Sequence, residues 1–310
     1  GGQRVFSTIA LLLTSLIGVH GSQSGISVMV FSKTAGFRHG SITDAQSMFR
    51  TFGSDLGWNV SFTEDSTWFS ASNLNQTDVV VFLMTSGDVF TVSQETAFQE
   101  YMLGGGGYVG VHSASDTEYG WSWYGEHLIG TYFSGHPHQQ TATTHVWNLA
   151  NDSLTSGGLI TQFFFNGSDA NAPWYSWERF DEWYNFRISV RNNTNLTRLA
   201  VLASLDEGTY SGGDMGADHP IIWTNELNSS TPSGVSGRMV YIGGGHTAES
   251  YSEAQFVRVI SNSVLWAARH IDAVATQTDA VTATTAAVTT QTVLTTQTDA
   301  VTTQTGAVTT

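Results

Sequence analysis

The stretch that decides the fold is Gly104-Gly105-Gly106-Gly107-Tyr108-Val109-Gly110-Val111-His112-Ser113-Ala114-Ser115-Asp116-Thr117. Its apolar residues indicate a buried strand, and its glycines allow the backbone to pack closely against its neighbours. The strand ends in a histidine, followed by hydroxyl side chains and a carboxylate. Because open α/β sheets bind their ligands at the carboxyl ends of the strands, we expect the candidate cleft here, with His112 at its centre.

Apolar segments typical of strands alternate with segments of helical periodicity along the rest of the chain. Strands are expected at 26–32, 59–62, 78–84, 108–111, 199–204, 221–224 and 239–242, and helices at 44–56, 93–103 and 253–269. Thr43 and Ser93 stand where the first two helices would be capped. The aromatic-rich region 118–195 is expected to add antiparallel strands. This alternation favours an α/β fold with a mainly parallel sheet and helices on both faces.

The composition limits the class of partner. Lys and Arg number 11 against 26 Asp and Glu, which gives a formal net charge of -15. Such a charge repels a phosphate backbone and an anionic membrane surface, so nucleic acid is not an expected partner. The chain has no cysteine, which excludes disulfides and cysteine-ligated zinc.

The first residues have the pattern of a signal peptide at 1–21. A basic start at Arg4 leads into the apolar run Ile9–Val19, and small residues follow up to Gly21. The run is too short to cross a bilayer, so no membrane span is expected. These features predict a secreted, extracellular protein.

Seven Asn-x-Ser/Thr sequons support the same location. They begin at Asn59, Asn75, Asn151, Asn166, Asn192, Asn195 and Asn228. None has proline at its middle position, so each is an acceptor for N-glycosylation in the secretory pathway. We therefore expect an exported glycoprotein.

The segment 272–310 changes abruptly to Thr, Ala, Val and Gln, with a repeat of about seven residues, as in Gln297-Thr298-Asp299-Ala300-Val301-Thr302-Thr303. It lacks the large apolar residues and charged flanks of a coiled coil. One interpretation is a disordered, O-glycosylated stalk. The other is a β-rich, fibre-forming segment through which the protein self-associates, because Thr and Val favour strands.

Short motifs occur in order between residues 26 and 269. They are Thr34-x-Gly36-Phe37-Arg38-His39-x-Ser41-Ile42, Gly107-x-x-Gly110-x-His112-x-Ala114, Gly135-His136-Pro137, Asp181-Glu182-x-Tyr184, His219-Pro220-x-x-Trp223 and Gly237-Arg238-Met239-Val240-Tyr241 followed by Gly245-His246. In these motifs the chain resembles the ThuA-like (trehalose-utilisation) family, which has the class I glutamine-amidotransferase-like, flavodoxin-like fold.

The resemblance implies one ThuA-like domain at 22–271 and a carbohydrate as the partner. It does not extend to glutaminase activity. A nucleophile elbow needs Cys or Ser within G-x-C/S-x-G, and the strand that ends at His112 has no such pattern. The chain is therefore not expected to be a glutamine amidotransferase.

Polar groups at or just beyond the predicted strand ends are the site candidates. We expect His112, His39, Glu182 and His246 as catalytic residues, because imidazole titrates near neutrality and a carboxylate can orient it for acid–base work. The expected substrate-binding residues are Arg38, Ser41, Asp181, Tyr184, His136, His219 and Trp223. These groups suit a sugar-active hydrolase or lyase, although the same histidines could serve only to hydrogen-bond backbone carbonyls.

Two alternatives stay open from the sequence. No cofactor is predicted, but a divalent metal with His136, His138 and a carboxylate as ligands is one alternative, without an H-E-x-x-H or EF-hand pattern to support it. The other concerns function. The protein could be a non-catalytic surface or fibre protein, in which a ThuA-like head sits on a Thr-rich, glycosylated stalk.

Deleting residues 272–310 should leave the melting temperature of the domain nearly unchanged and abolish any self-association. Ordering each residue costs ~1–2 kcal/mol of backbone entropy, which a segment so poor in large apolar residues cannot offset within one chain. Differential scanning calorimetry and analytical ultracentrifugation of the two forms measure both effects. A large fall in melting temperature would show instead that the segment packs on the domain.

Overall fold

The computed structural model describes residues 25–150, 156–196, 198–228 and 234–271. The expected leader at 1–21, the tail at 272–310 and the sequon asparagine Asn151 lie outside the described residues. The chain divides into two units, Gly1–Arg269 and His270–Thr310, and every element named below belongs to the first. Among the described residues, no helix is both long and apolar enough to pass through a bilayer.

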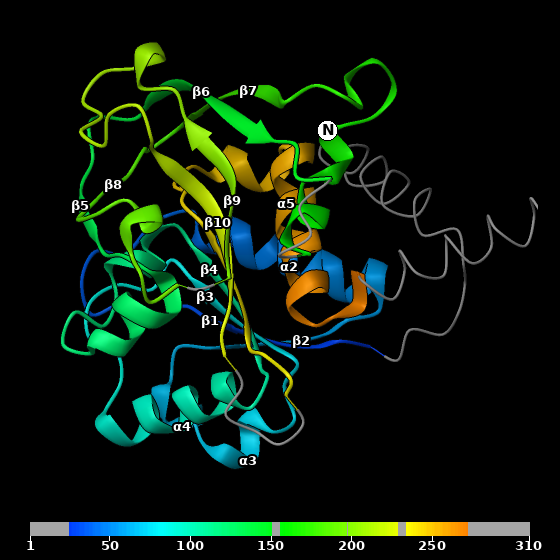
Figure 1. Ribbon diagram of the computed structural model, residues 1–310. Helices are drawn as coiled ribbons and strands as arrows, with labels where there is room; N and C mark the ends of the chain where they lie inside the picture. Colours follow the sequence, from blue (N-terminus) through cyan, green and yellow to red (C-terminus); the bar gives the residue numbers. More distant parts are fainter. Residues whose placement is uncertain (1–24, 151–155, 197, 229–233, 272–310) are drawn as a thin grey trace, which may run out of the picture. The chain divides into compact units, whose positions relative to one another are not determined.

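Nine strands of the described residues form one sheet, in the order β2-β1-β3-β4-β11-β10-β9-β6-β7 (Figure 1). Their bounds are β1 Ser27–Phe31, β2 Asn59–Thr63, β3 Val79–Leu83, β4 Gly107–Val111, β6 Gln140–Trp147, β7 Trp174–Asp181, β9 Leu199–Leu205, β10 Pro220–Glu226 and β11 Arg238–Ile242. Strands β2, β1, β3, β4 and β11 are parallel, and each later strand runs antiparallel to its neighbour. The expected α/β fold with a mainly parallel sheet is confirmed.

Helices cover both faces of the parallel strands. Their bounds are α2 Ile42–Leu56, α3 Ala71–Leu74, α4 Val92–Leu103 and α5 Ala254–Ala267. Helices α2 and α5 lie on one side of the strands, and α3 and α4 lie on the other (Figure 1). Shorter elements include the 3-10 helices η2 His112–Asp116 and η9 Ala248–Ser252, the π-helix η3 Tyr124–Ile129, and a small sheet of β5 Phe133–Gly135 and β8 Asn185–Phe186.

Two helices begin earlier than their predicted caps. The N-cap of α2 is Ser41, whose carbonyl accepts from the Ala45 N–H at 3.0 Å, so Thr43 lies inside the first turn. The N-cap of α4 is Thr91, whose backbone N–H donates to Gln94 Oε1 at 2.9 Å. The prediction at Ser93 was wrong because a Gln three residues after the cap specifies the helix start more strongly than a nearby hydroxyl residue.

An aromatic cluster fills the core between the sheet and α4. The Phe82 side chain on β3 is fully buried, and its ring lies 5.4 Å from the ring of Phe31 on β1 and 5.2 Å from that of Tyr108 on β4. The Phe98 ring on α4 stacks on Phe82 at 5.4 Å. These contacts join three parallel strands to one helix, and the carboxyl ends of these strands lead into the loops that carry polar side chains.

Replacing Phe82 with Ala should lower the free energy of unfolding by about 3–5 kcal/mol, because it removes a buried ring and leaves a cavity among aromatic neighbours. Phe180→Ala is the matched control, since this side chain at the end of β7 is 53% exposed. Urea unfolding of both variants measures the difference. Equal losses in the two variants would contradict the central position of Phe82.

Candidate active site

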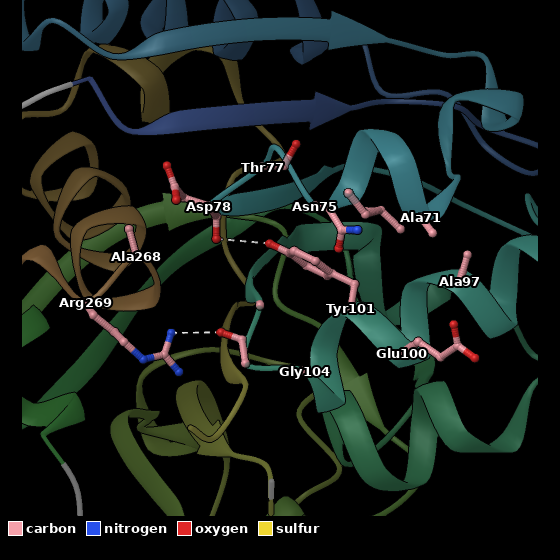
Figure 2. A pocket seen from close by; sticks show the side chains of 13 residues that line it. Ala71, Asn75, Thr77, Asp78, Ala97, Glu100, Tyr101, Gly104, Ala268 and Arg269 are labelled. Carbon is pink, nitrogen blue, oxygen red and sulfur yellow. Dashed lines mark hydrogen bonds between the residues drawn. The ribbon is translucent and has the colours of Figure 1, made fainter. Parts of the chain in front are cut away.

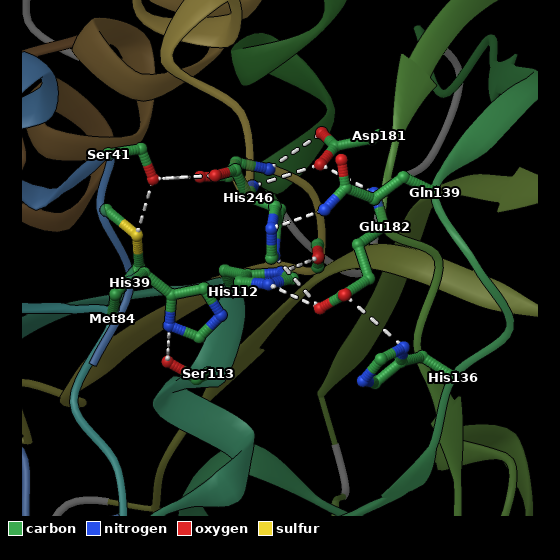
Figure 3. A network of polar contacts seen from close by, with 12 residues as sticks. His39, Ser41, Met84, His112, Ser113, His136, Gln139, Asp181, Glu182 and His246 are labelled. Carbon is green, nitrogen blue, oxygen red and sulfur yellow. Dashed lines mark hydrogen bonds and ion pairs between the residues drawn. The ribbon is translucent and has the colours of Figure 1, made fainter. Parts of the chain in front are cut away.

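Four polar side chains meet at the carboxyl edge of the sheet (Figure 3). His39 follows β1, His112 follows β4, Glu182 follows β7 and His246 follows β11. Each offers one atom suited to ligate a metal, and these four atoms all lie within 4.8 Å of one another. We call this set the His–Glu cluster. The structure thus brings together the four residues that the sequence nominated for catalysis.

His112 is the buried centre of the cluster. Its φ of 52°, a left-handed conformation that is uncommon outside glycine, turns the chain from β4 into η2. The side chain has no exposed surface, and Nδ1 lies 2.9 Å from the Gly243 carbonyl oxygen. In the neutral ring, Nδ1 therefore carries the proton and Nε2 carries a lone pair. Nε2 lies 3.3 Å from Glu182 Oε2, yet it has no hydrogen-bond partner among the described residues.

Glu182 is the anionic member of the cluster. Its Oε2 lies 3.0 Å from His246 Nδ1, and its Oε1 lies 3.3 Å from His136 Nδ1. Burial raises the pKa of the Glu182 carboxyl, but the contacts with His112 and His246 outweigh burial and hold that pKa well below its usual range. The carboxylate is therefore ionised at neutral pH.

His39 is the neutral imidazole of the cluster. Burial, followed by the charges of His112 and His246, lowers the pKa of His39 to about 3. Its Nδ1 lies 3.4 Å from Ser113 Oγ, the residue that follows His112 in the chain. The ring is 4% exposed and packs edge-on against both other histidines. His39 therefore presents a lone pair rather than a charge to its neighbours.

Asp181 has a structural task instead of the predicted contact with substrate. Its side chain is fully buried, and its oxygens accept from the backbone N–H groups of Gly245 at 2.8 Å and His246 at 2.9 Å. Arg179 Nη2, at 3.1 Å, offsets the buried negative charge. Asp181 thus holds the loop after β11 in the position that brings His246 to Glu182.

Ser41 and Tyr184 also support the cluster. Ser41 Oγ donates to the carbonyl oxygen of His246 at 2.7 Å. The Tyr184 ring covers His112, with the ring centres 4.1 Å apart. His136 is the more open neighbour, because its side chain is 39% exposed while it faces Glu182.

Four nominated residues lie elsewhere. Arg38 points to solvent and pairs with Glu64 at 2.7 Å. His219 is fully buried between Glu207 and the Tyr184 carbonyl, so it braces the chain that carries Tyr184.

Trp223 also belongs to the core. Its side chain is fully buried and Nε1 donates to the Ile129 carbonyl at 2.8 Å, so it has no surface to offer a substrate. His138 is exposed and is not a member of the His–Glu cluster. Among the described residues, the ligand atoms that converge are those of the cluster, and His136 and His138 are not among them.

Sequence reasoning missed three side chains around the cluster. Arg179 balances Asp181, Ser113 contacts His39, and Gln139 Nε2 lies 2.6 Å from His246 Nε2. Ser113 was within reach, because it sits in the strand-end stretch that carries His112. Nothing in the local sequence distinguishes Gln139, which comes close to His246 only through the antiparallel part of the sheet.

The composition of the cluster permits two kinds of chemistry. An ionised carboxylate beside several imidazoles suits proton transfer, because it stabilises the positive charge that a histidine gains with a proton. Three imidazoles and one carboxylate are also a ligand set able to hold a divalent transition-metal ion. The geometry of the cluster thus suits both acid–base work and metal binding.

A separate pocket of about 560 Å³ lies at the amino edge of the parallel strands (Figure 2). Asp78, just before β3, lines it together with Tyr101, whose hydroxyl donates to the Asp78 carbonyl at 3.0 Å. Arg269 Nη1 closes another side by donating to the Gly105 carbonyl at 2.9 Å. The members of the His–Glu cluster follow the other ends of the strands, so this pocket is not part of the candidate active site.

Comparison with known proteins identifies related chains. The family model described as ThuA, trehalose utilisation, matches residues 27–267. A ThuA-like protein from Bacteroides uniformis is 21% identical, has a TM-score of 0.61, and the match covers 80% of this chain and 94% of that one. A ThuA-like protein from Parabacteroides merdae is 16% identical, with a TM-score of 0.55 and coverage of 79% and 90%. Among curated proteins, none matches this chain.

The matched region runs from β1 to α5 and contains every member of the His–Glu cluster. At their level of identity, the two solved relatives establish the fold, and the family model covers more than half of the chain. The chain therefore belongs to the ThuA family, which is described by trehalose utilisation.

Proposed function

We propose that the protein binds and processes a carbohydrate by acid–base chemistry at the His–Glu cluster. The observation that carries this proposal is the ionised Glu182 carboxylate within 3.3 Å of the imidazoles of His112, His136 and His246. A histidine of this set that takes a proton from a sugar hydroxyl becomes positively charged, and the Glu182 carboxylate stabilises that charge. Membership of a trehalose-utilisation family supports a carbohydrate as the substrate class.

The more exposed histidines suit contact with the substrate. The side chains of His136 and His246 are 39% and 19% exposed, whereas that of His112 is fully buried. A hydroxyl group can therefore reach His136 and His246, while His112 lies behind them. A sugar carries no charge, so the formal net charge of -15 does not oppose its approach.

Glu182→Gln should reduce turnover of a carbohydrate substrate by about 10²–10⁴-fold, because it removes the charge that stabilises the protonated histidine. Glu178→Gln is the matched control, since this carboxylate lies on β7, the strand that leads to Glu182, and is exposed. A panel of trehalose, other glycosides and oxidised sugars would be tested for binding by calorimetry and for turnover by chromatography.

Two results would contradict this proposal. Full activity of Glu182→Gln would remove the cluster from the chemistry. Absence of both binding and turnover across the panel, with folded wild-type protein, would favour a non-catalytic head domain on a Thr-rich stalk.

We also propose that the protein is secreted and N-glycosylated, as its leader pattern and sequons suggest. The described sequon asparagines are all exposed, which supports access by the glycosylation machinery: Asn59, Asn75, Asn166, Asn192, Asn195 and Asn228.

Treatment of the native secreted protein with an N-glycosidase should increase its electrophoretic mobility, because each glycan adds mass. The untreated protein and a bacterially expressed form are the controls. Unchanged mobility after treatment would exclude N-glycosylation.

A further inference from the structure

We propose that the His–Glu cluster binds one divalent transition-metal ion, with His39 Nε2, His112 Nε2, His246 Nδ1 and Glu182 Oε2 as its ligands. This inference deepens the function proposed above and rests on it for the chemical role of the ion. The ligand geometry stands independently of the substrate.

The strongest observation is the lone pair on His112 Nε2. Because Nδ1 is directed at the Gly243 carbonyl, the neutral ring aims a bare nitrogen into the cluster, where it has no hydrogen-bond partner among the described residues. The atom facing it, 3.3 Å away, is the Glu182 carboxylate oxygen, which is also an electron-pair donor. Two such atoms at this separation in a buried site repel each other unless a proton or a metal cation lies between them.

Two of the donor-atom separations in the cluster match those of ligands that share one ion, within a set whose four atoms all lie within 4.8 Å of one another. Ligands at ~2.0–2.1 Å from a shared ion lie about 2.9 Å apart in octahedral geometry and about 3.4 Å apart in tetrahedral geometry. Glu182 Oε2 lies 3.0 Å from His246 Nδ1 and 3.3 Å from His112 Nε2. These separations are those of neighbouring ligands on a single ion.

The arrangement of the three rings gives the same result. With the ring centre ~3.2 Å from the ion, two imidazole ligands have centres about 4.5–5.2 Å apart. The observed separations are 4.7 Å for His39 and His112 and 4.9 Å for His39 and His246, both within this range, and 5.4 Å for His112 and His246, slightly beyond it. All three pairs meet edge to face, as rings that converge on one point do.

The second nitrogen of each ring is held from outside the cluster. Metal-ligating histidines characteristically use this nitrogen for an outer hydrogen bond, which fixes the ring and its tautomer. The outer partners are Ser113 Oγ for His39 at 3.4 Å, the Gly243 carbonyl for His112 at 2.9 Å and the Gln139 amide for His246 at 2.6 Å. The structure places Gln139 Nε2 toward this nitrogen; half a turn of the amide presents its oxygen instead, so that Gln139 accepts from His246 Nε2 and leaves Nδ1 for the ion.

The donor set selects the class of ion. Three imidazole nitrogens suit Zn²⁺ and its neighbours in the first transition series, whereas Mg²⁺ and Ca²⁺ prefer oxygen ligands throughout. The ion would polarise a sugar hydroxyl or a water molecule that approaches beside the partly exposed His136 and His246. The proton released from that oxygen passes to His136, which Glu182 Oε1 faces at 3.3 Å. Only an O–H bond breaks, and nothing is oxidised or reduced.

The test uses the wild-type chain freed of metal by a chelator and titrated with Zn²⁺ in a calorimeter. We expect one ion per chain, confirmed by mass-spectrometric metal analysis, and a rise in melting temperature with added Zn²⁺. His246→Ala should weaken binding by at least about 100-fold, and Gln139→Ala by about 10–100-fold, the usual effect of removing an outer partner. His127→Ala, an exposed histidine outside the cluster, should bind as the wild type does.

His112→Ala removes the buried ligand, and circular dichroism would establish whether it folds. If it does not fold, the Zn²⁺ affinity of His246→Ala tests the site instead, because His246 is only half-buried. Absence of Zn²⁺ binding by folded wild-type protein overturns the proposal, as does equal binding by wild type and His246→Ala.

The metal proposal and the carbohydrate proposal are contradicted by different results. Carbohydrate turnover that persists unchanged in chelated protein and does not respond to Zn²⁺ overturns the metal proposal but retains the acid–base function. Tight, stoichiometric binding of Zn²⁺ without turnover of any sugar supports the metal site and rejects the carbohydrate function.

Discussion

The candidate site depends on one buried carboxylate. Asp181, at the end of the outermost strand β7, accepts hydrogen bonds from the backbone of Gly245 and His246, in the loop after β11. Three strands separate β7 from β11 in the sheet, so this contact ties the antiparallel part to the parallel part at their common edge. Arg179 balances the charge, as a buried carboxylate requires. This tie brings Glu182, the next residue, beside His246.

The glycines of the loop after β11 allow this tie to form. A Cβ at Gly244 would lie 2.7 Å from Arg179 Nη1 and 2.8 Å from Asp181 Oδ2, too close for any other residue. Gly245 has a φ of 114°, which side chains disfavour. The run Gly243–Gly245 thus leaves room for the Arg179–Asp181 ion pair to lie close to the backbone. The glycine-rich motif after β11 is therefore needed for the His–Glu cluster to form.

Much of the fold was determined by local sequence. The apolar runs at 26–32 and 78–84 and the helical stripe at 253–269 are periodic enough to define their elements, and their alternation implies parallel strands. Parallel strands end at one edge, so the positions of His39 and His112 directly after two strands were sufficient to predict that they meet.

Tertiary structure decided the rest, because burial and partners depend on contacts between distant segments. The motif that contains His219 and Trp223 was as evident in the sequence as the motifs that contain the cluster residues. Both side chains are nevertheless fully buried and belong to the core. Asp181 and Glu182 are adjacent in sequence, but a residue at the end of a strand and the one after it face different ways, so one braces the backbone and the other enters the cluster. The sequence by itself determined that His39, His112 and His246 follow strands that end at this edge, and only the packing of the antiparallel strands against the parallel ones brought Glu182 and Gln139 to them.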